Sequence, residues 1–353
     1  MIRSSRRRSL QWIGGIASVI SLTLILSRIL PPAYDFYGVY YPALRDVWSG
    51  RFSYMTSPGY LNPPWALVLM LPLGLFDVAV ARALLLVMTF LALAWCMHDL
   101  RRCHFSYPLA AISAPMFALV WLGQLEVFSL LGVSIGYRAV IQRRPWLFAV
   151  AFLLLLIKPQ ETWLIVIVLL LGSMRRFAWI EWLRIALIIF GIALVTSLWL
   201  GGVWLDRMGG GAATYSAQWQ NFSLWRLAEI MPIGIVVVLA AIIACATFFA
   251  LKRVGLSRAG LGLAAAAGNV LSPYLTAPHL IMTMSFGWGL SMDRAPKWSA
   301  IVYLTSLTPL LRTISGDQTL NRLDVIFPVL VLIVLIDAVR RTACGAANED
   351  LVR

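Results

Sequence analysis

The chain has 353 residues, of which 61% are hydrophobic and only 12% are charged, and its mean hydropathy is +0.83. A soluble chain carries about a quarter charged residues, so this composition excludes a water-soluble protein and leaves no room for a sizeable soluble domain. The net charge of +14 would suggest nucleic acid in a soluble protein. In a membrane protein the same excess marks the cytoplasmic loops, so we expect a lipid bilayer and no nucleic acid as partner.

The chain begins with a basic stretch, residues 1–10, followed by an apolar run from Trp12 to Leu30. A cleaved signal peptide is one interpretation, and the arginines Arg6 to Arg8 loosely resemble a twin-arginine signal. However, the run is long for a signal peptide, and no small-residue cleavage site follows it. We therefore predict a first transmembrane helix preceded by a cytoplasmic N-terminus.

Clusters of Lys and Arg recur along the rest of the chain, and the positive-inside rule places them in the cytoplasm. Apolar hairpins lie between them at about 105–122 with 124–141, 146–157 with 161–173, 180–200 with 233–251, 259–271 with 278–292, and 298–311 with 325–339. We interpret 64–97 as a short helix followed by one span. The pattern predicts an all-α polytopic membrane protein with about 12 transmembrane helices. It forms a single domain over 11–342 with a cytoplasmic tail at 343–353, in the plasma or inner membrane.

This topology brings the polar hairpin tips and the long loops to the outer face. The tips are 123–126, 158–161 and 272–279, and the loops are 31–63, 201–231 and 312–324. The runs that flank Lys158 and Glu161 are short for a full span, so both charges are predicted to lie below the membrane surface, at a cost of about 2.5–3.5 kcal/mol each. Short helices broken at polar turns commonly line an enclosed cavity. The alternative is a tight turn with Lys158 extended toward water.

One carboxylate and many aromatic residues distinguish the loop 31–63. Asp35 follows the first helix at the membrane boundary, where partial desolvation raises the pKa of a carboxylate toward that of a useful base. A solvated acid at a helix end is the alternative interpretation. Pro63 and Pro64 fix the return of the chain into the membrane, so the loop is held at both ends. We regard it as a candidate platform for sugar rings, although interfacial aromatics are common in membrane proteins.

Several short motifs occur in a characteristic order between about residues 10 and 290. They are Asp35 after the first helix, the spaced tyrosines and glycine before Pro63-Pro64, Gly123-Gln124, Lys158-Pro159, Asn221-Phe222-Ser223-Leu224, and Leu271-Ser272-Pro273 with His279. The set resembles glycosyltransferase family 87, which comprises polyprenyl-phosphate-mannose-dependent mannosyltransferases of the GT-C fold. The resemblance implies transfer of mannose or a related hexose on the outer face, with inversion at the anomeric carbon. The implied partners are a polyprenyl-phosphate sugar donor and a lipid-linked or cell-envelope glycan acceptor.

The resemblance also implies roles for individual residues. Asp35 matches the catalytic carboxylate, and we expect it to take the proton from the acceptor hydroxyl that attacks C1 of the donor. The departing polyprenyl phosphate is already a stable anion, so it requires no general acid, but it needs cationic and hydrogen-bond partners. The candidates for binding this phosphate are Lys158, His279, Arg312 and Arg322. The candidates for binding the sugar or the acceptor are Tyr40, Tyr60, Asn62, Gln124, Glu126, Gln160, Glu161, Asn221 and Tyr274.

Other interpretations stay open at these positions. A lone His in an apolar stretch is usually a packing residue, and polar tip residues also suit interhelical hydrogen bonds, worth about 0.6 kcal/mol each in membranes. Glu126 or Glu161 is an alternative general base. The sequence has no Asp-x-Asp pair, P-loop or Gly-x-Gly-x-x-Gly, and its four cysteines lack metal-ligand spacing. We therefore expect no nucleotide-sugar donor, no metal and no cofactor.

A secondary transporter or flippase is the main alternative from another functional class, because broken helices and buried ions also mark transport sites. Transporters usually contain repeats and place polar groups near the membrane midplane. The sequence shows no internal repeat, and its polar groups gather on one side. An inactive GT-C-like scaffold that binds lipid-linked glycans is a third possibility. The enzyme hypothesis requires Asp35, Lys158 and His279 to border one cavity.

Overall fold

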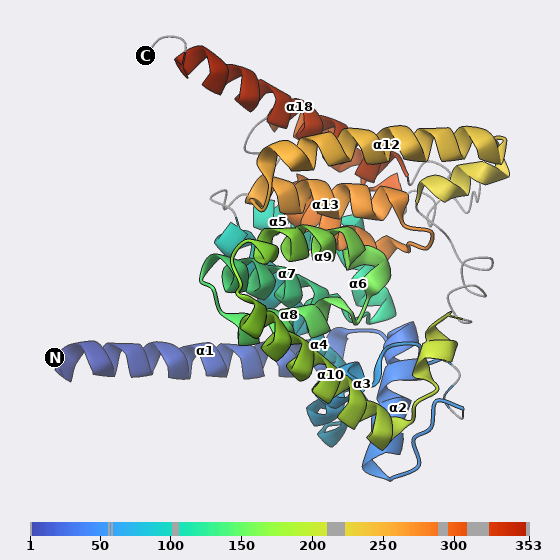
Figure 1. Ribbon diagram of the computed structural model, residues 1–353. Coiled ribbons are helices and arrows are strands. Elements are labelled where there is room, and N and C mark those ends of the chain that lie inside the picture. Colours follow the sequence, from blue (N-terminus) through green and yellow to red (C-terminus); the bar gives the residue numbers. More distant parts are fainter. Residues whose placement is uncertain are drawn as a thin grey trace.

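The computed structural model describes residues 2–55, 57, 59–100, 106–209, 223–288, 296–308 and 325–350. Every regular element within these ranges is a helix (Figure 1), as the all-α prediction requires. The longer helices are α1 (Ile2–Ile29), α2 (Tyr41–Trp48), α3 (Pro64–Met70), α4 (Val78–Leu100), α5 (Ser106–Ala111), α6 (Ala114–Leu122), α7 (Glu126–Ile141), α8 (Pro145–Leu155), α9 (Pro159–Met174), α10 (Trp179–Leu200), α12 (Ile233–Val254), α13 (Arg258–Leu271), α16 (Pro296–Thr305) and α18 (Ile326–Asp350). Short turns are η1 (Phe36–Tyr40), η2 (Leu71–Leu75), η3 (Leu224–Glu229), η4 (Ala277–His279), α14 (Leu280–Met282) and η5 (Thr283–Trp288).

Several of these helices are suited to a bilayer by length and composition. Within the described ranges, Val78–His98 of α4, α10 and α12 are long and apolar enough to cross one. Shorter apolar helices are Ile13–Ile29, Pro64–Leu75, Pro145–Leu155 and Pro159–Met174. Only 17% of the apolar window of α10 and 22% of that of α12 is buried, which suits helices that face lipid tails. The protein is therefore a helical membrane protein, and the number of about 12 crossings stays a prediction.

Prolines divide two of the predicted segments. The helix α3 continues as the 3₁₀ turn η2 before the long helix α4 begins, which agrees with a short helix followed by one span. The predicted single span at 105–122 is instead two helices, α5 and α6. Ser113 caps α6 by accepting a hydrogen bond from the Met116 N–H, and Pro115 occupies its first turn. A proline supplies no N–H to a preceding turn, so the helix restarts there.

The helix α13 lies at the centre of the fold. All of its residues from Ala259 to Val270 are buried, and it contacts α9, α12, α18 and η5. Small side chains allow helices in a membrane to approach closely, and α12 and α13 lie side by side in Figure 1. The Gly/Ala-rich run 260–268 therefore serves close helix packing.

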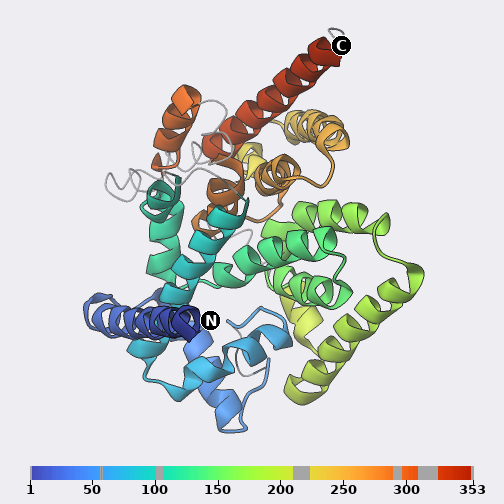
Figure 2. The ribbon, with the colours of Figure 1, turned by 90° about the vertical axis from the view of Figure 1, so that its left-hand side faces the viewer.

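Several segments that the topology places on one side of the membrane lie at one end of the molecule. The start of α1, the turn 255–257 between α12 and α13, and the free end of α18 all lie on the left in Figure 1. Figure 2 turns this end toward the viewer and shows the exposed helix α10 far from α1. The position of the start of α1, the turn 255–257 and the end of α18 at one end of the molecule agrees with the predicted topology. The assignment of this end to the cytoplasm stays a prediction.

Candidate active site

A cavity of about 550 Å³ lies where the loop after α1 meets the α6–α7 turn, the α8–α9 turn and the segment that follows α13. Most of the predicted site residues that belong to the described part of the chain line it, namely Asp35, Tyr40, Asn62, Gln124, Lys158, Gln160, Tyr274 and His279. The structure thus places Asp35, Lys158 and His279 on the wall of one cavity, as the enzyme hypothesis requires.

The other predicted site residues have different locations. Glu126 and Glu161 are completely buried next to Lys158 and His279 and do not line the cavity. Tyr60 is buried as well and packs its ring against the rings of Tyr40 and Tyr54, so it supports the loop 31–63 from within. The predicted candidates Arg312, Arg322 and Asn221 lie outside the described residues.

Asp35 is positioned by a break in the helical geometry. The helix α1 ends at Ile29 before two consecutive prolines, which cannot continue it. The chain then forms the π-helical turn η1 directly after Asp35. Such turns are rare and occur frequently at functional sites. Ala33 and Phe36 flank Asp35 and are fully buried, so they anchor the segment while the Asp35 carboxylate faces the cavity.

The surroundings of Asp35 set its basicity. Burial raises the pKa of the Asp35 carboxyl above its ordinary value, while the positive charge of Lys158 and a hydrogen bond from Gln124 oppose this shift. The negative charge of Glu126 raises the pKa further. A carboxylate with a raised pKa holds a proton more strongly than a solvated one, which is the property that a general base requires.

Gly123 joins the Asp35 segment to the α6–α7 turn. Its backbone is left-handed, with φ +72°, and a Cβ at this position would lie 2.7 Å from the Phe36 Cβ and 2.8 Å from the Ala33 Cβ. Any larger residue would therefore separate the turn from the segment that carries Asp35.

We expect Gly123→Ala to lower the stability of the protein. The left-handed backbone costs a non-glycine residue about 1–2 kcal/mol, and overpacking adds about 1–3 kcal/mol. Thermal unfolding in detergent micelles measures the effect. Gly191→Ala is the matched control, because Gly191 lies within α10 with open space around it. An unchanged melting temperature for Gly123→Ala would contradict the close contact.

Lys158 is held in place at the start of α9. Its side chain is 3% exposed, and its Nζ atom lies 2.5 Å from Glu126 Oε1 and 2.5 Å from Gln124 Oε1. Pro159 begins the helix after it, and the Thr162 hydroxyl donates to the Leu155 carbonyl across the turn at 2.7 Å. The ammonium is therefore a fixed positive charge at the cavity wall.

One nitrogen of the His279 ring faces the buried pair of Lys158 and Glu126. The backbone N–H of Thr276 donates to His279 Nδ1 at 3.0 Å, so Nδ1 is an acceptor and the proton of the neutral ring resides on Nε2. His279 Nε2 lies 3.9 Å from Glu126 Oε1. The Asn269 side chain donates to the His279 carbonyl at 3.1 Å and fixes the turn η4. The imidazole is thus a prearranged hydrogen-bond donor beside Lys158.

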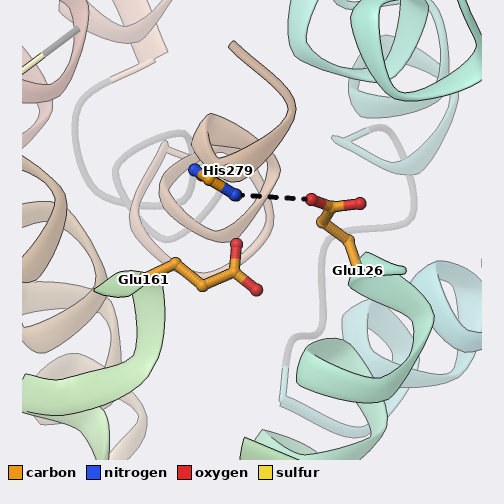
Figure 3. Close-up of side chains that lie close together, drawn as sticks. All are labelled: Glu126, Glu161 and His279. Atoms are coloured by element: carbon orange, nitrogen blue, oxygen red, sulfur yellow. Dashed lines mark ion pairs between the residues drawn. The ribbon is translucent and has the colours of Figure 1, made fainter. Parts of the chain in front are cut away.

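Within the described ranges, Glu126, Glu161 and His279 are grouped closely enough that they could hold a metal ion. Their ligand-type atoms all lie within 4.8 Å of one another, and Figure 3 shows a carboxylate oxygen of Glu161 pointing toward the His279 ring. The Ser129 hydroxyl donates to Glu161 Oε1. The Lys158 ammonium already contacts the Glu126 oxygen nearest to His279. A metal ion would have to share that oxygen with a buried positive charge, so the arrangement fits the ammonium better.

Some residues that line the cavity were not predicted from the sequence. Met208 and Gly209 line the cavity from the loop 201–231, but neither belongs to the motif 221–224 in that loop. Thr276 lines it as well and orients His279. A Thr three residues before a His at the start of a helical turn is a capping pattern, which is the one signal that could have identified Thr276.

The fold and the site define a helical membrane protein with acidic, cationic and imidazole groups around one cavity. The sequence model of glycosyltransferase family 87 matches residues 60–278, which is more than half of the 353 residues. The chain therefore belongs to glycosyltransferase family 87, and it is a glycosyltransferase. No curated protein and no solved structure matches it.

The range that the family model matches includes some of the site residues but not others. Gln124, Lys158 and Tyr274 lie within it, whereas Asp35 precedes it and His279 follows its last residue. The membership favours an enzyme over the transporter or flippase alternative. The roles of Asp35 and His279 depend on their geometry.

Proposed function

We propose that the protein transfers a hexose, specifically mannose, from a polyprenyl-phosphate sugar to a lipid-linked or cell-envelope glycan. The reaction takes place on the outer face of the plasma or inner membrane, with both termini in the cytoplasm. The observation that carries the proposal is the composition of the cavity wall. A carboxylate with a raised pKa, an ammonium and an imidazole N–H line the same space of about 550 Å³.

In the proposed reaction Asp35 accepts the proton of the acceptor hydroxyl as that oxygen attacks C1 of the donor sugar. The new C1–O bond forms while the bond from C1 to the phosphate oxygen breaks, and polyprenyl phosphate departs with the electron pair. Attack from the face opposite the phosphate inverts the anomeric carbon. Lys158 and the His279 Nε2–H stabilise the negative charge that develops on the leaving phosphate.

The remaining polar groups at the cavity have binding roles in this proposal. Tyr40, Asn62, Gln160 and Tyr274 offer hydroxyl and amide groups to the sugar hydroxyls of donor and acceptor. Glu126 and Glu161 support the cavity wall, because neither lines it. Arg312, Arg322 and Asn221 stay candidates on the basis of the sequence.

The donor class is tested with purified protein in lipid nanodiscs. We expect release of polyprenyl phosphate and formation of a glycosylated lipid from polyprenyl-phosphate mannose, and no transfer from a nucleotide-linked mannose. Replacing mannose by glucose on the same lipid tests the sugar. Transfer from the nucleotide sugar alone would contradict the proposal. Movement of the lipid-linked sugar across the bilayer without turnover would instead support the transporter or flippase.

The pH dependence of the transfer rate follows from Asp35. Only the ionised carboxylate accepts a proton, so kcat falls as the pH falls through the pKa of Asp35. Because burial raises this pKa, we expect the loss of activity at a higher pH than an ordinary solvated aspartate would give. A pH profile of kcat in nanodiscs measures it. An acid limb at the position of an unperturbed aspartate would argue against this environment.

A further inference from the structure

Gln124 has more defined partners than a simple sugar-binding amide. Its Oε1 atom accepts from Lys158 Nζ at 2.5 Å and from the Tyr40 hydroxyl at 3.0 Å, and its Nε2 atom donates to Asp35 Oδ2. An ammonium is only a donor, and a carboxylate is only an acceptor. A flipped amide would place its NH₂ group against Lys158 and its oxygen against Asp35. The partners therefore admit one orientation, in which the N–H faces Asp35.

The groups that orient this amide are themselves fixed. The Lys158 ammonium is 2.5 Å from Glu126 Oε1, and the pair is 3% and 0% exposed. Tyr40 is 5% exposed and belongs to η1, the turn that begins next to Asp35. Because both donors are almost fully buried, the surrounding protein holds each of them against Gln124.

The backbone at Gly123 supplies a second, independent constraint. The close approach of Gly123 to the Cβ atoms of Ala33 and Phe36 places the α6–α7 turn directly against the residues that flank Asp35. The side chain of Gln124 and the backbone before it thus contact the same segment. This double contact fixes the position of the Gln124 N–H relative to the Asp35 carboxylate.

We propose that Gln124 is a positioning residue for Asp35. Its N–H holds Oδ2 of the carboxylate and leaves Oδ1 to receive the acceptor proton. The chain of contacts from Glu126 through Lys158 and Gln124 to Asp35 aligns the base. This inference rests on the proposed function, and it differs from the role in sugar or acceptor binding that the sequence indicated for Gln124.

The two roles differ in their kinetic consequences. Loss of a positioning contact misaligns the base, so kcat falls by about 10- to 100-fold while KM changes little. Loss of a hydrogen bond to the ionised form also raises the pKa of Asp35, so the acid limb of kcat moves to higher pH. Loss of a sugar contact would instead raise KM and leave the acid limb in place.

The experiment compares Gln124→Met with Gln160→Met in nanodiscs, because both glutamines line the same cavity and undergo the same chemical change. We expect a lower kcat and an acid limb at higher pH for Gln124→Met only, and a change confined to KM for Gln160→Met. Tyr40→Phe removes one of the two donors to Gln124 Oε1, so it should lower kcat and move the acid limb to higher pH by a smaller amount. The loss of its proposed sugar contact should raise KM as well. This variant preserves the test if Gln124→Met does not fold.

A measurement that requires no sugar transfer tests this inference separately from the proposed function. Infrared difference spectra follow protonation of the Asp35 carboxyl, and the band that disappears in Asp35→Asn identifies it. If wild type transfers no sugar, the proposed function fails, while the infrared titration still tests Gln124. An Asp35 titration that is identical in wild type and in folded Gln124→Met, or a higher KM with unchanged kcat, would overturn the positioning role.

Discussion

Asp35→Asn is expected to lower the rate of sugar transfer by about 10²- to 10⁴-fold, the usual contribution of a general base. The substitution retains the size of the side chain and its position at the cavity, but an amide cannot accept the proton of the acceptor hydroxyl. Binding of the donor should change little, since Lys158 and His279, the residues proposed to bind its phosphate, are unchanged in this variant. Release of polyprenyl phosphate and the KM for donor measure the two effects.

Asp46→Asn is the control for this variant. Asp46 lies in α2, in the same loop, and its carboxylate is 36% exposed and 3.8 Å from the Arg51 guanidinium. It does not line the cavity, so we expect the wild-type rate. Equal rates for wild type and Asp35→Asn would exclude Asp35 as the base. Loss of activity in Glu126→Gln or Glu161→Gln alone would then favour one of the alternative bases.

Lys158→Met is expected to abolish transfer and to lower the free energy of unfolding by about 3–5 kcal/mol, the usual cost of removing one partner of a buried ion pair. The substitution leaves the Glu126 carboxylate buried without its cation and removes a donor from Gln124. It also removes the positive charge that we propose stabilises the departing phosphate. Thermal unfolding and the transfer assay, both in nanodiscs, measure the two losses.

Lys252→Met serves as the control, because Lys252 is exposed in the last turn of α12 and does not line the cavity. Its stability should stay within about 0.5 kcal/mol of wild type. The double variant Lys158→Met with Glu126→Gln removes both charges, so we expect it to recover much of the stability but none of the activity. If the single variant is as stable as wild type, the buried ion pair does not stabilise the fold.

The sequence predicted most of the helices but not where some of them break. Long apolar runs identified α8, α9, α10, α12 and α13, because a bilayer requires both the length and the internal hydrogen bonding of a helix. The break between α5 and α6 was missed. Pro115 lies in a continuous apolar run, and hydropathy alone does not distinguish a tolerated proline from a new helix start.

The sequence predicted individual residues of the candidate site, but not which of them contact one another. Motif order indicated Asp35, Gln124, Lys158 and His279, which all line one cavity. Nothing in the sequence indicated that the Gln124 amide faces Asp35, or that Glu126 lies behind Lys158. Hydrogen-bond partners separated by 34 to 89 residues depend on how the helices pack.

The sequence by itself determined that the protein is an all-α membrane protein and a member of glycosyltransferase family 87. Composition decided the first point, because so apolar a chain must satisfy its backbone hydrogen bonds within lipid, and helices do so internally. Only the tertiary structure decided which polar residues reach the cavity and which are buried behind it. That division depends on the close packing of the turns at Gly123, Lys158 and His279 around Asp35, which places some side chains toward open space and others between helices.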